Sequence, residues 1–206
     1  MPEPSRRPGL LVKLLALVGL ATLVGLALAY YGFIDVAATR PEPKFVAGFF
    51  HEVMEHSVER RARAAVERGE LVVPDLADPA RRRRGLEEYV EMCVTCHGAP
   101  GIRASAAGQG LNPPVTDLVK DPSEPAEAFW VVKHGIRMTG MPAFGPTHDD
   151  ETLWDIVAFL DELPRLDAAG YAERVRQRGL DTAGAGHEAA PHEHAGEEHG
   201  PPGGRS

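Results

Sequence analysis

The sequence predicts an all-α protein, and three observations support that fold class. Apolar residues recur at steps of three and four, the period of a helix, in several separate stretches. The run 14–33 holds 20 residues without a charge, which is the length of a membrane-crossing helix. Gly135 and Pro164 stand where two periodic stretches stop, and both residue types end helices. The other expected helices cover 43–68, 82–94, 124–134 and 150–163.

Residues 1–34 are expected to form a basic leader and a transmembrane anchor. Arg6, Arg7 and Lys13 lie ahead of the apolar run, and positive charge favours a cytoplasmic location for that end. The rest of the chain would then lie outside, in the periplasm, after a single pass through a bacterial inner membrane. A cleaved signal peptide is the alternative, because the Ala-Leu-Ala at 27–29 resembles a cleavage site.

Residues 35–79 are expected to form a helical connector. Apolar side chains at helical spacing predict an amphipathic helix over 43–68. That helix would lie on the membrane or on the domain that follows. Pro74 and Pro79 are expected to end it, because proline removes a helical hydrogen bond.

A C-x-x-C-H run at 93–97 contains both cysteines of the chain. This run is the attachment signature of a c-type haem, whose two vinyl groups form thioethers with Cys93 and Cys96. His97 then places an imidazole on the iron. A thioredoxin-like thiol pair is the alternative, but it requires a βαβ setting that the flanking sequence lacks. Because both thiols are used, the sequence excludes a disulfide, a zinc thiolate site and a cysteine nucleophile.

Two helices are expected to frame this motif. Gly85, Tyr89 and Cys93 fall four apart and therefore share one face of the first helix. A glycine on that face lets a second helix approach closely. The last helix, over 150–163, has Asp149 as its expected N-cap.

A second iron ligand is expected from the segment around Met141. Thioether sulfur is a soft ligand that favours ferrous iron, so a His/Met pair raises the reduction potential. Met141 is followed by a proline and lies 44 residues past His97. Met138 is the competing thioether, and His134 and His148 are competing imidazoles.

Three motifs occur one after another within about residues 80–166. They are Gly85-x-x-x-Tyr89-x-x-x-Cys93-x-x-Cys96-His97, then Thr139-Gly140-Met141-Pro142-Ala143-Phe144, then a Leu-Trp-x-Ile-Val-x-Phe-Leu helix. Together they resemble a class I c-type cytochrome domain, above all the monohaem domain of the cbb3-oxidase cytochrome subunits and their membrane-anchored relatives. The resemblance implies a small helical bundle around one haem c, with the first and last helices crossing near Gly85 and Tyr89.

The resemblance also implies roles for individual residues. Cys93 and Cys96 would carry the haem thioethers, and His97 and Met141 would be the axial ligands of the haem iron.

The family's ligand histidine donates a hydrogen bond to a proline carbonyl, which fixes the imidazole and tunes the iron. Pro113 or Pro114 is the candidate for that proline here. Trp130 is a further candidate for the haem pocket, although large aromatic residues serve more often as core.

The C-terminal end divides into a short helical extension at 167–182 and a tail at 183–206 rich in His, Glu, Gly and Pro. The tail has too few apolar residues to fold and is expected to be disordered. Its histidines and glutamates could bind a transition metal weakly, but no rigid scaffold sets a geometry.

The charge and the motifs of the chain limit the classes of function that it can have. Between Gly85 and Arg165 there are 13 acidic and 5 basic residues, so nucleic acid is not an expected partner. The sequence therefore predicts a single-electron carrier, not an enzyme, with no small-molecule substrate and with transient redox partners in the respiratory chain. Its alternatives are a fixed subunit of a larger oxidase or dehydrogenase, and a haem sensor or peroxidase-like protein with an open sixth site.

Overall fold

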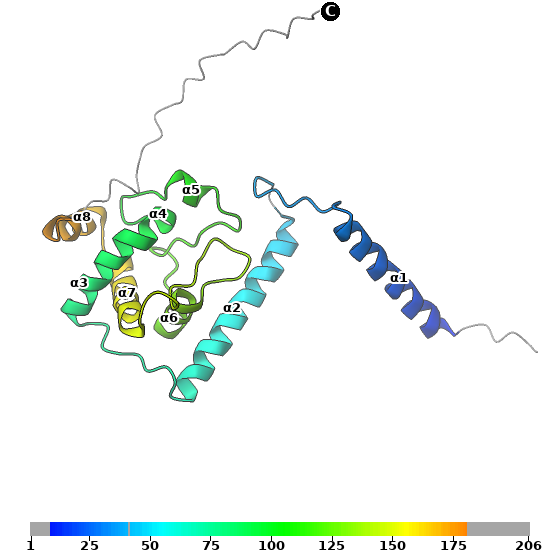
Figure 1. Ribbon diagram of the computed structural model, residues 1–206, viewed down its shortest axis with the longest axis horizontal. Helices are drawn as coiled ribbons and strands as arrows, with labels where there is room; N and C mark the ends of the chain where they lie inside the picture. The colour runs from blue at the N-terminus through cyan, green and yellow to red at the C-terminus, as the bar shows by residue number, and fades with distance from the viewer. Residues whose placement is uncertain (1–8, 41, 181–206) are drawn as a thin grey trace, which may run out of the picture. The chain divides into compact units, whose positions relative to one another are not determined.

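The computed structural model describes residues 9–40 and 42–180, and within them the chain is helical, as predicted (Figure 1). A single isolated β-bridge between Ala99 and Ile102 is the only extended pairing in those ranges. The chain divides into two compact units, residues 1–41 and 42–206. The expected tail at 183–206 lies outside the described residues.

The first unit contains α1, Leu10–Tyr30, a helix of 21 residues. Its side chains are exposed along its whole length, and its length and hydropathy suit a membrane span. The helix starts before the uncharged run because Lys13 is compatible with a helix. It ends before Gly32, whose φ of 79° is left-handed and breaks the helix.

The second unit begins with α2, Lys44–Glu67. Its bounds agree with the expected 43–68 to within one residue at each end, but Pro74 and Pro79 do not end it. Its last residue is Glu67, and Gly69, with a φ of 69°, provides the left-handed residue common after helices. Pro79 instead occupies the first turn of α3, where a missing N–H costs nothing, and Asp78 caps that helix by accepting from the Ala80 N–H at 2.8 Å.

The helix at the attachment motif is not uniform. α3, Pro79–Glu88, continues into a π-helical turn at Tyr89–Cys93 and then into α4, Val94–His97. The sequence predicted one helix over 82–94 and did not distinguish the wider turn. Gly98, with a φ of 68°, ends the run directly after the histidine.

The remaining helices end as the residue types indicate. Asp149 accepts from the Thr152 N–H at 2.8 Å and so caps α7, and Gly135, with a φ of 64°, ends α6. A 3₁₀ turn that contains Pro164 follows α7. The elements are α5 Ala106–Gln109, α6 Pro125–His134, α7 Asp150–Glu162, the 3₁₀ turn Leu163–Arg165 and α8 Ala168–Gln177.

α3 and α7 pack against each other at the position expected for the crossing. A Cβ atom at Gly85 would overlap the main-chain carbonyl of Asp155 and lie 2.9 Å from the Cβ of Phe159. The Tyr89 and Phe159 rings meet one turn further along, with centroids 5.3 Å apart. The small residue and the aromatic residue therefore perform the packing roles that the sequence assigned to them.

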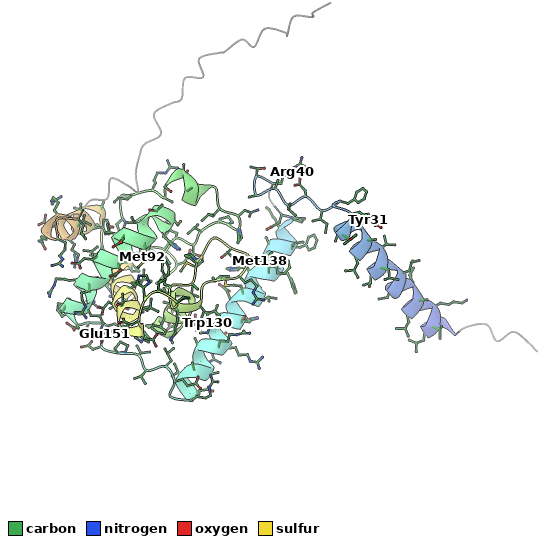
Figure 2. All side chains as sticks on the ribbon, viewed as in Figure 1. Tyr31, Arg40, Met92, Trp130, Met138 and Glu151 are labelled. Carbon is green, nitrogen blue, oxygen red and sulfur yellow. The ribbon has the colours of Figure 1, made fainter. Side chains whose placement is uncertain are left out.

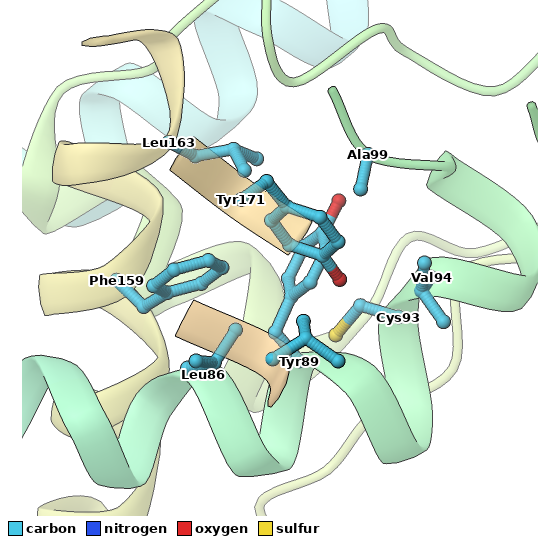
Figure 3. Packing of buried hydrophobic residues seen from close by; sticks show 9 residues of the cluster. Leu86, Tyr89, Cys93, Val94, Ala99, Phe159, Leu163 and Tyr171 are labelled. Atoms are coloured by element: carbon cyan, nitrogen blue, oxygen red, sulfur yellow. The ribbon is translucent and has the colours of Figure 1, made fainter. Parts of the chain in front are cut away.

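Two buried clusters form the core, one on each side of α7. The first joins α3, the attachment motif and α8, and it contains Tyr89, Cys93, Phe159 and Tyr171 (Figure 3). The second joins α6 and α7 with the segment after α2. Met92 packs against both, so the π-helical turn contacts each cluster.

Candidate haem-binding site

The two cysteines are free thiols in different surroundings. Cys93 closes the π-helical turn and is buried, whereas Cys96 is half-buried in α4. Burial, with a smaller contribution from Cys96, raises the pKa of the Cys93 thiol to about 12. An attacking thiol needs a lowered pKa, and burial of Cys93 acts in the opposite direction.

His97 is oriented by a backbone carbonyl. Its Nδ1 lies 3.0 Å from the carbonyl oxygen of Thr116. A carbonyl only accepts, so Nδ1 carries the proton and donates, which leaves the lone pair of Nε2 free for a metal. Burial lowers the pKa of His97, and the bond to Thr116 opposes that effect. The ring is therefore held as the neutral tautomer that a haem iron requires.

The carbonyl partner corrects a prediction. Thr116, and neither Pro113 nor Pro114, faces Nδ1 of His97. The loop after the motif is long, and its chain reaches the imidazole two residues beyond Pro114. Pro114 nevertheless lines the same cavity as His97.

A cavity of about 500 Å³ lies beside the attachment motif. Cys96 and His97 form part of its wall, and the segments 99–104 and 114–120 form most of the rest. α5 packs closely against the motif: a Cβ atom at Gly108 would lie 2.8 Å from the Cα of Cys96. The wall next to the motif is thus formed by closely packed main chain.

The Met141 loop is held by hydrogen bonds within itself. The Ile136 N–H donates to the Met141 carbonyl at 3.2 Å. The Thr139 hydroxyl donates to the Ile136 carbonyl at 2.8 Å and accepts from the Met141 N–H at 3.1 Å. A Cβ at Gly135 would lie 2.8 Å from the Met141 carbonyl. The loop therefore has a fixed shape before any ligand is considered.

The two methionines of this loop differ in exposure. Met141 is half-buried and packs against the second core cluster. Met138 is 90 % exposed, with a left-handed φ of 64°, and Figure 2 shows it on the loop. The structure therefore favours Met141 over Met138 as an internal ligand. Met141 does not line the cavity beside His97.

The remaining aromatic candidates, like Met141, do not line the cavity beside His97. Trp130 lines a groove between α2 and α6. His134 lines the same groove and packs against Trp130. The His148 ring lies within hydrogen-bonding distance of its neighbours Thr147 and Phe144. Neither histidine lines the cavity that contains His97.

Comparison with known proteins agrees with these features. Residues 80–160 match the family model described as cytochrome C oxidase, cbb3-type, subunit III. Searches of curated proteins and of solved structures found no match. The matched region runs from the first turn of α3 to Leu160 in α7, so α2 and α8 lie outside it.

The residues present fit a covalently held haem. Two free thiols, an imidazole with a free Nε2 and an internal thioether are the donors that such a group takes. The family match extends across all four of these donors. The region 80–160 is a c-type cytochrome domain, which carries haem c with its iron and supports electron transfer through it.

Proposed function

We propose that this protein is a membrane-anchored monohaem cytochrome that passes single electrons between proteins of a respiratory chain. Cys93 and Cys96 would hold the haem through thioethers, and His97 and Met141 would bind its iron. The observation that carries the proposal is the hydrogen bond from His97 Nδ1 to the Thr116 carbonyl, because it leaves Nε2 available for iron.

The bound haem supplies a one-electron couple between ferric and ferrous iron. The chain's contribution is to fix the two ligands. The Thr116 carbonyl sets the orientation of the imidazole, and the closed turn from Ile136 to Met141 holds the thioether. With His97 and Met141 both bound to the iron, no position would remain open for small ligands such as oxygen, and the group would serve electron transfer alone.

The N-terminal helix supports attachment to a membrane. α1 is long and apolar enough to cross a bilayer, and the basic residues near its start favour a cytoplasmic N-terminus. The haem domain then lies on the periplasmic side and meets its redox partners at the membrane surface. A protein confined in this way docks weakly and transiently, as redox partners do.

The ligand assignment is tested by visible spectroscopy of the haem-loaded protein. Met141→Ala is compared with Met138→Ala, a matched control from the exposed side of the same loop. We expect the weak red band of Met-ligated ferric iron in the wild type and the control, and its loss in Met141→Ala. Carbon monoxide should bind the reduced Met141→Ala variant only. Carbon monoxide binding to the reduced wild type at neutral pH would overturn the closed-site proposal and favour a sensor or peroxidase-like protein.

Membrane attachment is tested separately by extracting cell membranes with alkaline carbonate. A spanning helix resists this treatment, and we expect the haem protein to remain in the pellet. Release of a shortened haem protein into the supernatant would show that the N-terminal segment is a cleaved signal peptide.

A further inference from the structure

α2 carries two separate apolar surfaces. Val58 and Ala62, in its second half, are buried, and this helix packs against α6. Phe45, Phe49 and Phe50, in its first half, are exposed by 79, 64 and 64 %. Val53, at 48 %, extends the exposed set.

The two surfaces lie on different sides of the helix. A helix turns by about 100° per residue, which places the exposed set of Phe45, Phe49, Phe50 and Val53 nearly opposite Val58 and Ala62. The exposed side is therefore not a continuation of the side that packs against the domain. Within the described residues nothing covers it.

We propose that Phe45, Phe49, Phe50 and Val53 form a surface that inserts into the interface of the lipid bilayer. This inference rests on the proposed membrane anchoring by α1. It goes beyond that proposal because it assigns a second contact with the membrane, made by a helix that packs directly on the cytochrome domain.

The length of the connecting chain supports lipid as the occupant. The segment between the two helices runs from Tyr31 to Pro43, 13 residues, and spans at most about 45 Å when fully extended. Its other end carries Tyr30, Tyr31 and Phe33, all exposed. Aromatic residues collect at the level of lipid headgroups, so the connection keeps the start of α2 within that distance of the bilayer surface.

The distribution of charge is also suitable. Glu55 and its partner His51 lie on the side of the helix away from the phenylalanine surface, whereas Glu52 and its partner His56 lie at the edge of that surface. A helix with an apolar side and a charged side lies in the plane of the interface. The proposed insertion rests on the apolar side chains and not on a basic surface, so neutral phosphatidylcholine should suffice.

The test places a tryptophan reporter on each side of α2 in the full-length, haem-loaded protein. Phe49→Trp is compared with the matched control His51→Trp, from the opposite side of the helix, in phosphatidylcholine vesicles with and without brominated acyl chains. Bromine quenches indole only at contact depth, and the wild-type protein gives the background from Trp130 and Trp154. Unchanged haem spectra confirm that both variants fold.

We expect brominated lipid to lower the added emission of Phe49→Trp at least twofold and to leave that of His51→Trp within about a tenth of its original value. Equal or absent quenching, in protein that resists carbonate extraction, would overturn this inference while leaving the anchor intact. A surface reserved for a protein partner would give that result, because the vesicles contain lipid alone. Release by carbonate would overturn the anchor and this inference together.

Discussion

Gly85 and Asp155 touch through their main chains, at the point where α3 crosses α7. A methyl group at residue 85 would occupy the position of the Asp155 carbonyl, and backbone cannot rotate away as a side chain can. We therefore expect Gly85→Ala to destabilise the haem-loaded protein by about 3 kcal/mol or more. Unfolding in guanidinium chloride, followed by helical circular dichroism, measures this loss.

Gly48→Ala is the matched control, because Gly48 lies within α2 with nothing near its Cβ position. Alanine is the better helix former, so this change should be neutral or stabilise by up to about 1 kcal/mol. Equal losses from the two substitutions would contradict the close crossing.

Tyr89 and Tyr171 share one buried cluster, but only one of their hydroxyl groups has a partner. The Tyr89 hydroxyl donates to the Gly98 carbonyl at 2.6 Å, whereas that of Tyr171 has no partner among the described residues. Tyr89→Phe should cost about 1–2 kcal/mol, because it leaves a buried carbonyl unpaired. Tyr171→Phe should be neutral or stabilise by about 1 kcal/mol. Denaturation of the two variants measures the difference, and equal losses would show that Tyr171 does have a hydrogen-bond partner.

Asp155 is the buried carboxylate of the core and pairs with two arginines of α3. Arg81 approaches it to 2.7 Å, and Arg84 also binds it. Asp155→Ala should cost about 3 kcal/mol, because it leaves the largely buried Arg81 guanidinium without its partner. Asp161→Ala is the control, since Asp161 is more exposed and should cost less than about 1 kcal/mol. Thermal unfolding of the two variants provides the comparison, and similar losses would refute the buried pair.

Glu127 makes the packing of α2 on α6 dependent on pH. Burial raises the pKa of Glu127, and so do the nearby carboxylates Glu59, Glu124 and Glu55, while Arg63 opposes them. A raised pKa means that the folded state binds the proton more tightly. Stability therefore falls as pH rises from the unfolded pKa, near 4.5, through the folded value.

Glu127→Gln should then stabilise the protein at pH 7 by a few tenths of a kcal/mol and have no effect near pH 4. Unfolding midpoints of wild type and variant across that range measure the change. A variant that is less stable at pH 7 would show that the carboxylate makes a favourable contact instead.

Much of the fold could be predicted because its helix ends depend on residue type. Asp149 and Gly135 cap their helices as expected, since a carboxylate that accepts an N–H and a left-handed glycine are local devices. The cytochrome resemblance was likewise confirmed, because a haem attached by two thioethers requires a fixed short motif. Gly85 was identified because only a glycine permits such a close helix crossing.

Other features depend on the three-dimensional path of the chain. The Thr116 carbonyl could not be predicted, since every residue has a carbonyl and only the loop path selects one. The contact of Trp130 with the groove along α2 likewise depends on how α2 packs, which the sequence around Trp130 does not indicate. The end of α2 was assigned to prolines, although Gly69 ends the helix five residues before Pro74.

The π-helical turn at Tyr89–Cys93 sets the direction in which the attachment motif leaves the α3–α7 crossing. Such a turn accommodates one more residue than a regular turn of the same helix. If the same residues formed a regular helix instead, the Cys-x-x-Cys-His segment would be rotated by about 100° relative to Gly85. Every side chain would keep its chemistry, yet the thiols and the imidazole would point to a different part of the domain.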